Sequence, residues 1–471
     1  MRLNHNRILP LIILSLGSLI ACKKNVDVPA PPTVVTPPAA PVVVVADPNK
    51  IKDSVLLYTK DLYLWQNQIP STFDARSFAD PEAIMTSMRQ YSIEPGFSAP
   101  VDRWSFAMKK TKWDNLSGGL SSTFAAGSEV VGDFGLSVFF FAQGDLRVRS
   151  VERESPAGRA GIRRSWRITK INGNSNIESS NASFIVDAVY ESTKTTFTFI
   201  KPDGTTTDIS LTAANYKKHP VHFDTVYTVN SKKIGYLVFN SFLGDTVEIN
   251  NEFNRVFNNF SSQNVSDVVI DLRYNGGGYV SVQKKLANYL INSSANNSLM
   301  MKEQYNDKNS SYNSSVFFKK TGTLNLNRIF FIVSNSTASA SELLINNLKP
   351  YMDVKLIGPT NTHGKPVGYF PVPVGEWYIF PVSFKTTNKN GEGSYFNGFP
   401  VNSKVNDGIN KDWGDITESC LASSIKFISG GAFRTQGEVV YTELLPEVKR
   451  SNSILDAPFF KGIVETTRAS N

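Results

Sequence analysis

From about residue 230 onward, short apolar runs typical of buried strands alternate with runs in which apolar residues recur at helical spacing. Strands are predicted in KKIGYLVFNSF, SDVVIDLRYNGGG, NRIFFIVS and VKLIGP, and helices in YVSVQKKLANYLI and SASELLINNLKP. Such alternation is typical of β-α-β units, whose strands are parallel and whose helices cover the sheet. We therefore predict an α/β core over residues 220–430, with a C-terminal tail at 431–471. The polar stretch NNSLMMKEQYNDKNSSYNSS within the core is predicted to be a surface loop.

Two further regions are predicted before this core, because 471 residues are too many for one ordinary domain. Residues 49–118 show helical spacing, and Asp80-Pro81 forms a plausible helix start. Residues 130–213 contain short β-rich runs separated by Gly, Asn and Asp turns. A short helix that begins near Pro156 interrupts these runs.

The β-rich region resembles a PDZ domain, most closely in SPAGRAGIRRSWRITKINGNSN. The resemblance implies that the loop Phe134, Gly135, Leu136 and Ser137 binds a peptide's C-terminal carboxylate through backbone N–H groups, while the peptide adds a strand to the sheet edge. Ser137 stands where the family commonly has Gly, and SWRI stands where a Gly-Asp turn is usual. The alternative is a domain that only packs against its neighbour.

The N-terminus is typical of an exported protein. Positive charge in MRLNHNR precedes the apolar run ILPLIILSLGSLIA, which is too short for a permanent membrane span, so residues 1–22 are predicted to be a signal peptide. Leu19-Ile20-Ala21-Cys22 resembles the lipobox of bacterial lipoproteins, which implies lipid attachment at Cys22 and a membrane-anchored protein of the cell envelope. Residues 23–48 are rich in Pro, Val and Ala and are predicted to be an extended linker. The alternative is an ordinary signal sequence with an incidental cysteine.

Composition excludes several classes of partner. The net charge of +8 is modest and spread along the chain, so we expect no nucleic-acid partner. Cys420 is the only cysteine besides Cys22, so no disulfide framework is expected, and Cys420 is predicted to be a small buried residue. No His, Cys or carboxylate cluster has the spacing of a metal site, and we expect no metal or cofactor.

The hydroxyl-rich stretch SNSTASASELLINNLKP, residues 334–350, lies where a predicted strand becomes a helix. Ser339 and Glu342 have the spacing of a capping box, which would be a purely structural role. However, the carboxyl end of a parallel strand is where open α/β sheets bind ligands, and a helix N-terminus stabilises an oxyanion. A nucleophilic Ser339 is therefore the second hypothesis.

A serine nucleophile needs a base, and Lys365 follows the next predicted strand. A lysine with an ordinary pKa of about 10.4 is almost entirely protonated at pH 7, so burial must lower its pKa by about two to three units. The surrounding sequence THGKPVGYFPV contains no Asp or Glu that would oppose such a shift.

Three elements together resemble the C-terminal-processing (tail-specific) serine peptidases, and they occur in that family's order. They are the segment Thr337–Glu342, the pair Gly364-Lys365 and the loop DLRYNGGG. The resemblance implies a crotonase- and Clp-protease-like core with an inserted PDZ domain, Ser339 as nucleophile and Lys365 as general base. It also implies oxyanion-binding N–H groups at Ala340, Gly276 and Gly277, while Asp271 and Arg273 hold the loop in shape.

The third catalytic residue is unassigned. Members of the family often carry Gln or Glu four residues after the lysine, where this chain has Tyr369. Others place an Asp between the serine and the lysine, and Asp353 is the nearest candidate. A pairing of Ser339 with His363 remains an alternative to the Ser–Lys pair, whereas His219 and His222 fall in the linker after the PDZ-like region.

The function predicted from these elements is that of a lipid-anchored serine endopeptidase that cleaves peptides or unfolded proteins of the cell envelope. One alternative is an inactive relative that binds peptides or acts as a scaffold. Another is a non-peptidase enzyme on the same core, which predicts a small closed pocket beside Ser339 rather than an open groove.

Overall fold

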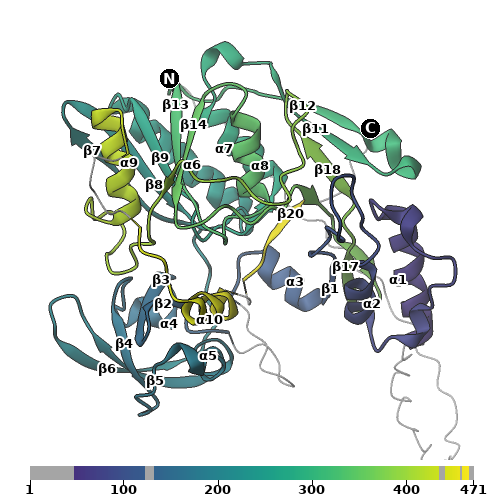
Figure 1. Ribbon diagram of the computed structural model, residues 1–471, viewed down its shortest axis with the longest axis horizontal. Helices are drawn as coiled ribbons and strands as arrows, with labels where there is room; N and C mark the ends of the chain where they lie inside the picture. Colours follow the sequence, from purple (N-terminus) through teal and green to yellow (C-terminus); the bar gives the residue numbers. More distant parts are fainter. Residues whose placement is uncertain (1–46, 122–131, 434–440, 457–458, 466–471) are drawn as a thin grey trace, which may run out of the picture. The chain divides into compact units, whose positions relative to one another are not determined.

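The structure is a computed structural model that describes residues 47–121, 132–433, 441–456 and 459–465 (Figure 1). The predicted signal peptide with Cys22, and all of the predicted linker except Asp47 and Pro48, lie outside these residues. Within the described ranges, no helix combines the length and the apolar character that a bilayer crossing requires.

The core is built on a sheet with the strand order β19-β14-β13-β9-β8-β7. The strands β8, β9, β13, β14 and β19 pair in parallel, which confirms the prediction of parallel β-α-β units, and β7 is antiparallel to β8. The elements of this layer are β7 (Val221–Val229), β8 (Lys232–Phe239), α6 (Thr246–Ser262), β9 (Asp267–Asp271), β10 (Gly277–Tyr279), α7 (Val280–Leu290), β13 (Arg328–Ile332), α8 (Ala340–Leu348), β14 (Asp353–Gly358), β19 (Ser403–Lys404) and α9 (Ser419–Gly430).

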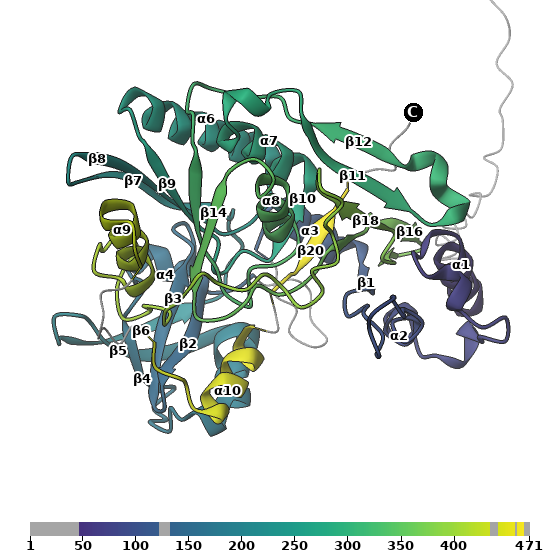
Figure 2. The same ribbon diagram turned by 45° about the horizontal axis from the view of Figure 1, so that its top comes forward.

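Helices cover both faces of this sheet, and successive strand residues therefore enter opposite hydrophobic cores. On β9, Val268 and Ile270 pack on the side of α6, α7 and α8, whereas Val269 packs with α9. Figures 1 and 2 show α9 on one side of the sheet and the other three helices on the opposite side. Cys420 of α9 is buried in the second core, as predicted.

Smaller sheets extend the core toward the N-terminal helices. One has the order β12-β11-β18-β15, and the other has the order β1-β17-β16. A shared hydrophobic cluster joins the second of these sheets to α1, α2 and α3. The elements are α1 (Pro48–Leu62), α2 (Pro81–Met88), β1 (Phe106–Lys109), α3 (Lys110–Ser117), β11 (Leu299–Tyr305), β12 (Ser314–Phe317), β15 (Val367–Gly368), β16 (Val372–Val374), β17 (Trp377–Phe380) and β18 (Phe384–Thr387).

Two details of these regions test local sequence predictions. The side chain of Asp80 accepts a hydrogen bond from the Ala83 amide, so Asp80-Pro81 does begin α2. The prediction of a surface loop within residues 296–315 is wrong, because these residues contain all of β11 and the first half of β12. The polar composition concealed an alternation in which Met301 and Glu303 face inward and Lys302 outward.

The β-rich region forms a separate sheet with the order β2-β3-β4-β5-β6 and its own hydrophobic core. Strand β2 lies at one edge of this sheet. The elements are β2 (Leu136–Ala142), β3 (Asp145–Val151), α4 (Pro156–Arg159), β4 (Arg167–Ile171), α5 (Ala182–Val186), β5 (Lys194–Ile200) and β6 (Thr206–Thr212).

The predicted C-terminal tail contains α10 (Pro446–Asp456) and β20 (Gly462–Val464). Helix α10 packs on the β-rich unit, where Val448 and Leu455 are buried in its core. Strand β20 pairs in parallel with β10. Figure 2 shows β20 beside β10 and α10 beside the β-rich sheet. The chain after residue 441 thus returns from the β-rich unit to the core.

Candidate active site

Ser339 lies between β13 and α8, at the carboxyl end of the parallel strand. Its φ of +65° and ψ of −112° fall in a region that non-glycine residues rarely adopt. Residues held in such conformations cluster at functional sites, because the surrounding structure must oppose the strain. The backbone therefore fixes Ser339 in a special position at the start of the helix.

Ser339 stands at the N-cap of α8 and forms a capping box with Glu342, as its spacing predicted, but its hydroxyl is not satisfied by this arrangement. The residue is fully buried, and its Oγ has no hydrogen-bond partner among the described residues. An unpaired buried hydroxyl is costly, so natural proteins seldom retain one without a chemical reason. This observation favours the nucleophile hypothesis over the purely structural one.

Glu342 joins the serine and lysine segments. Its Oε2 accepts hydrogen bonds of 2.8 Å from the backbone amides of both Ser339 and Lys365. Its Oε1 accepts bonds of 2.6 Å from the Thr362 hydroxyl and the Gly364 amide. Because Ser339 and Lys365 share one carboxylate oxygen, their amides lie at most twice 2.8 Å apart. Burial raises the pKa of the Glu342 carboxyl, while these hydrogen bonds act to lower it.

Lys365 is also fully buried. Its Nζ donates to the Val367 carbonyl at 3.1 Å and lies 4.0 Å from the centre of the Tyr369 ring. Burial lowers the pKa of Lys365 to about 7, and the charges of Asp102 and Glu342 oppose this effect without cancelling it. A substantial fraction of the amine is therefore neutral near pH 7, as a general base requires.

His363 is committed to other contacts. The indole N–H of Trp104 donates to His363 Nε2 at 3.2 Å, and His363 Nδ1 lies 3.2 Å from the Asn335 carbonyl. Burial lowers the pKa of His363 to about 4, and the nearby cations act in the same direction. Its amide donates to the Thr337 carbonyl, so the residue connects the loop that contains Lys365 (the lysine loop) to the loop that contains Ser339.

The two candidates for a third catalytic residue have very different positions. Tyr369 is buried against Lys365, and its hydroxyl donates to the Lys461 carbonyl at 3.2 Å. Asp353 begins β14 at the end opposite the site, and its half-exposed carboxylate pairs with Lys355 at 2.8 Å. The structure therefore brings Tyr369 to the site and leaves Asp353 outside it.

The predicted oxyanion elements meet at the same place. A Cβ atom placed on Gly277 would lie 2.9 Å from both the Ala340 nitrogen and Ser339 Cβ, so the glycine loop touches the start of α8. The φ of Gly277 is +103°, which favours glycine. Its N–H donates to Asn275 Oδ1 at 2.9 Å, so this predicted donor is engaged within its own loop. Gly276 accepts a hydrogen bond from the Gly462 amide through its carbonyl.

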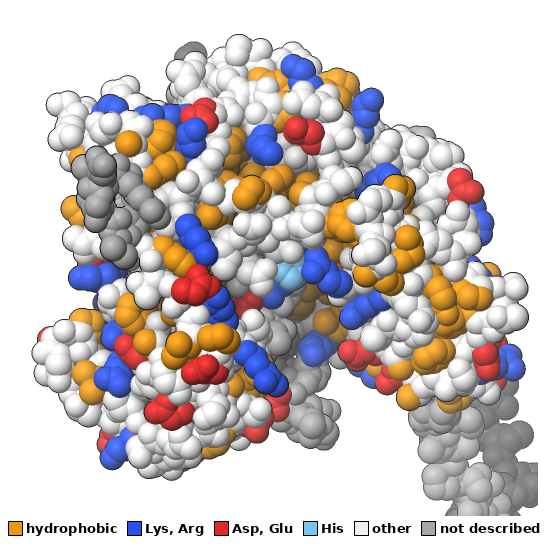
Figure 3. All heavy atoms as spheres, viewed as in Figure 1, with side chains coloured by type: hydrophobic (Ala, Val, Ile, Leu, Met, Phe, Trp, Pro, Cys, Tyr) orange, Lys and Arg blue, Asp and Glu red, His pale blue; other side chains and the backbone are white. Residues whose placement is uncertain are grey.

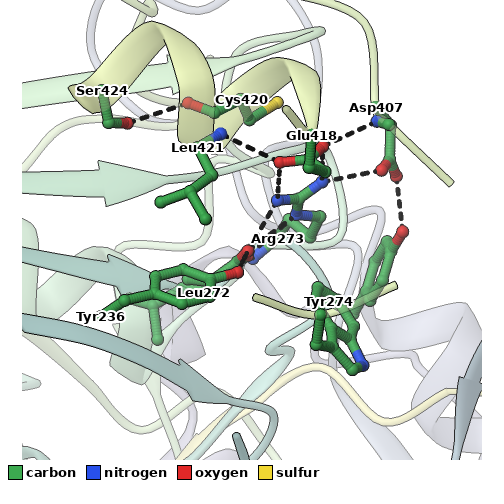
Figure 4. Close-up of polar contacts among 12 residues, drawn as sticks. Tyr236, Leu272, Arg273, Tyr274, Asp407, Glu418, Cys420, Leu421 and Ser424 are labelled. Atoms are coloured by element: carbon green, nitrogen blue, oxygen red, sulfur yellow. Dashed lines mark hydrogen bonds and ion pairs between the residues drawn. The ribbon is translucent and has the colours of Figure 1, made fainter. Parts of the chain in front are cut away.

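A buried ion network supports the glycine loop (Figure 4). Arg273 contacts Asp271 at 2.6 Å, Glu418 at 2.8 Å and Asp407 at 2.9 Å, and its side chain is 1% exposed. Arg164 of the β-rich unit contacts Asp407 as well. Asp271 and Arg273 thus hold the loop in shape, as predicted.

A cavity of about 420 Å³ opens beside the lysine loop. Aromatic and basic side chains line it, among them Arg89, Arg103, Trp104, His363 and Phe460. Figure 3 shows Lys and Arg side chains around a hollow in the middle of this face, where histidine surface is also visible.

The predicted peptide-binding loop of the β-rich unit lies apart from these residues and is tightly packed. Phe134 is buried, and the Gly135 amide donates to Asp133 Oδ1. Leu136 pairs with Val151 of β3, and Ser137 Oγ contacts Ser150 Oγ at 2.7 Å. The free edge of β2 is covered by α10, since Asn452 bonds both the N–H and the carbonyl of Phe140.

Sequence reasoning missed several residues of the site. Asp102 and Trp104 come from the N-terminal region, far from any catalytic motif, and carried no recognisable signal. The most extensive omission is β20, which borders the glycine loop and Tyr369. The apolar run in FFKGIVE, residues 459–465, was the one sign of this strand.

Comparisons with known proteins agree on one family. Residues 233–398 match the model described as Peptidase family S41, and residues 50–106 match the Peptidase S41 N-terminal domain. A probable CtpA-like serine protease of Staphylococcus aureus (strain COL) is 29% identical over 242 residues, which cover 50% of this chain and 46% of the relative. A relative with the same description from Staphylococcus saprophyticus is 28% identical over 241 residues, again 50% and 46%. The chain thus spans about half the length of these curated relatives.

Among solved structures, a putative S41 protease from Bacteroides fragilis matches with a TM-score of 0.64 and 24% identity. The match covers 80% of this chain and 97% of that protein. At this identity the likeness concerns the fold.

The Arg273 network yields a stability prediction. Arg273→Met should lower the free energy of unfolding by about 3–5 kcal/mol, because it leaves buried carboxylates without their cation. Arg255→Met is the matched control, since Arg255 is half-exposed and its ion pairs with Asp224 and Glu252 lie at the surface, where about 0–1 kcal/mol is expected. Urea denaturation monitored by circular dichroism measures both changes. Equal losses in the two variants would contradict the role given to the network.

Proposed function

This chain belongs to peptidase family S41, and on that premise we propose that it is a serine endopeptidase with a Ser339–Lys365 dyad. The observation that carries the proposal is the unpaired, buried Ser339 hydroxyl in a segment joined through Glu342 to a lysine whose pKa is lowered to about 7. We expect its substrates to be peptides or unfolded proteins.

In the proposed mechanism, Ser339 Oγ attacks a peptide carbonyl while Lys365 Nζ accepts the hydroxyl proton. The tetrahedral intermediate collapses when the C–N bond breaks, and the Lys365 ammonium gives its proton to the leaving amine. A water molecule then attacks the acyl-enzyme carbonyl while Lys365 Nζ accepts its proton. When the ester C–O bond breaks, the Lys365 ammonium returns that proton to Ser339 Oγ, which regenerates the free enzyme. Tyr369 positions the amine through its ring face.

The developing oxyanion needs N–H donors. We assign one to Ala340 at the N-terminus of α8, where the helix dipole adds a favourable field. The second donor comes from the Gly276–Gly277 loop. The Gly277 N–H supplies it when its hydrogen bond to Asn275 Oδ1 is replaced by one to the oxyanion. The contact of Gly277 with Ser339 and Ala340 supports this arrangement.

The β-rich unit is proposed to be PDZ-like and to recruit substrate or to gate the site. Its short α4 fits that comparison, and the edge of β2, where a peptide would add a strand, is occupied by Asn452 of α10. The coupling route is Asp456, which pairs with Arg149 of the β-rich unit at 2.8 Å and accepts from Ser336, three residues before the nucleophile.

A substitution series tests the dyad. Ser339→Ala and Lys365→Met should each reduce casein and peptide hydrolysis about a thousandfold or more, because nucleophile and base act as a unit. Lys355→Met is the matched control, since Lys355 pairs with Asp353 outside the site and should keep wild-type rates. An inactive scaffold protein predicts the same background signal from wild type and Ser339→Ala, and that result would overturn the proposal.

The pH profile separates the lysine from the histidine alternative. With Lys365 as base, kcat/KM should rise as the pH passes about 7 and level off above it, because only the neutral amine accepts the proton. A His363 base would place the rise near pH 4. His363→Gln should therefore leave the midpoint near pH 7. A midpoint near 4 in the wild type, lost in His363→Gln, would exclude the lysine.

We further propose that the mature protein is lipid-anchored in the bacterial cell envelope through Cys22. Wild type should incorporate an alkyne-labelled fatty acid and partition into detergent, whereas Cys22→Ala should do neither. Cys420→Ala is the matched control, because Cys420 is buried and should not affect labelling. Equal labelling of Cys22→Ala and wild type would contradict the anchor.

A further inference from the structure

We propose that residues 459–465 occupy the substrate groove as an intramolecular pseudosubstrate strand, which must leave before a peptide reaches Ser339. This inference rests on the proposed function, because it identifies the groove in which a substrate strand is bound. The occupant is a segment of this chain, and it implies an extended substrate with glycine at one position.

The segment lies between β10, which belongs to the glycine loop, and Tyr369. On one side, β20 pairs in parallel with β10, and the Gly462 amide donates to the Gly276 carbonyl at 2.9 Å. On the other side, the Tyr369 amide donates to the Ile463 carbonyl at 3.1 Å. The Glu465 amide donates to the Tyr369 carbonyl at 3.0 Å. Strand addition holds an extended peptide by main-chain hydrogen bonds to one sheet edge, and this segment makes such bonds on both of its edges.

The segment also lies near the start of α8, where Ser339 and Ala340 are. A Cβ atom placed on Gly277 would lie 2.5 Å from the Gly462 carbonyl oxygen and 2.9 Å from both Ser339 Cβ and the Ala340 nitrogen. The Gly462 carbonyl, Ser339 Cβ and the Ala340 nitrogen therefore all lie beside Gly277. A peptide carbonyl of a bound substrate would lie in this place.

The described state is closed to substrate. Ser339 and Lys365 are both 0% exposed, so a peptide cannot reach either of them without a movement. The strand in direct contact with the glycine loop and with Tyr369 is β20. Its displacement would open an extended groove and would expose Ile463 and Val464, which are buried in the two neighbouring hydrophobic clusters.

Ion pairs connect the segment to the β-rich unit. Lys461 and Arg149 contact the same carboxylate, that of Asp456, which ends α10. Helix α10 in turn covers the edge of β2 through Asn452. Consecutive parts of one chain segment thus occupy both edges at which a peptide would add a strand.

Gly462 gives the groove a size requirement. A side chain at this position would meet the Tyr369 hydroxyl at 2.2 Å, within a wall of the groove. A peptide in the same register therefore needs glycine there, which supplies a matched control for the experiment.

The experiment releases the segment after the full chain has folded. Ala457-Pro458 is replaced by the recognition sequence of a site-specific protease, and the purified protein is cut and diluted to nanomolar concentration. Tethering gives the segment an effective concentration of about millimolar, which cutting removes. Peptide hydrolysis should rise at least tenfold after the cut, whereas wild type treated with the same protease should not change.

Adding the synthetic peptide of residues 459–471 should then restore the inhibition, and the same peptide with Gly462→Val should not. Mass spectrometry shows whether the cut peptide has left the protein. If it has left and hydrolysis is unchanged, the proposal is overturned. Loss of the cooperative unfolding transition on its departure would also overturn it, because β20 would then be a structural strand.

A binding measurement separates this proposal from the proposed function. In the Ser339→Ala background, fluorescein-labelled peptide 459–471 should bind the cut protein in a one-to-one complex and should not bind the uncut protein. If no form hydrolyses peptides but this difference in binding is found, the pseudosubstrate is retained and the peptidase proposal fails. Equal binding to cut and uncut protein would overturn the pseudosubstrate.

Discussion

The arrangement of the site depends on the carboxylate of Glu342. Its two oxygens accept hydrogen bonds from the amides of Ser339, Gly364 and Lys365 and from the hydroxyl of Thr362. Four donors on one buried acceptor replace the water that the carboxylate gives up, which makes its burial tolerable. The same bonds fix two loops that follow different strands of the sheet. A helix-capping interaction, which usually stabilises one terminus, here connects two segments.

The parallel sheet makes this connection geometrically simple. β9, β13 and β14 are neighbours, and each is followed at its carboxyl end by one component of the site. The glycine loop follows β9, Ser339 follows β13, and Lys365 belongs to the segment after β14. Ion pairs of Arg273 with Asp271 and Glu418 stabilise the glycine loop. Consequently the three components converge although Gly276 and Lys365 are 89 positions apart in the sequence.

Sequence patterns predicted the parts of the fold that depend on local periodicity. The strands β8, β9, β13 and β14 and the helices α7 and α8 lie where apolar spacing placed them. The same reasoning failed for β11 and β12, where polar composition concealed the buried positions. It also gave no structure to residues 431–471, because α10 and β20 are stabilised by contacts with distant units. Ser339 and Lys365 could be proposed from motifs, whereas Asp102 and Trp104 approach the lysine only in three dimensions.

Burial of Lys365 couples the folding equilibrium to proton concentration. The unfolded chain carries an ordinary lysine with a pKa near 10.5, whereas the folded chain holds this amine at about 7. Between these two values the unfolded state binds more protons, so this residue makes the native state progressively more favourable as the pH rises through that window. Below pH 7 both states are protonated, and the full desolvation cost of the ammonium weighs on the native state. The group that we propose as the base thus also lowers the free energy of unfolding, and this loss becomes smaller at alkaline pH.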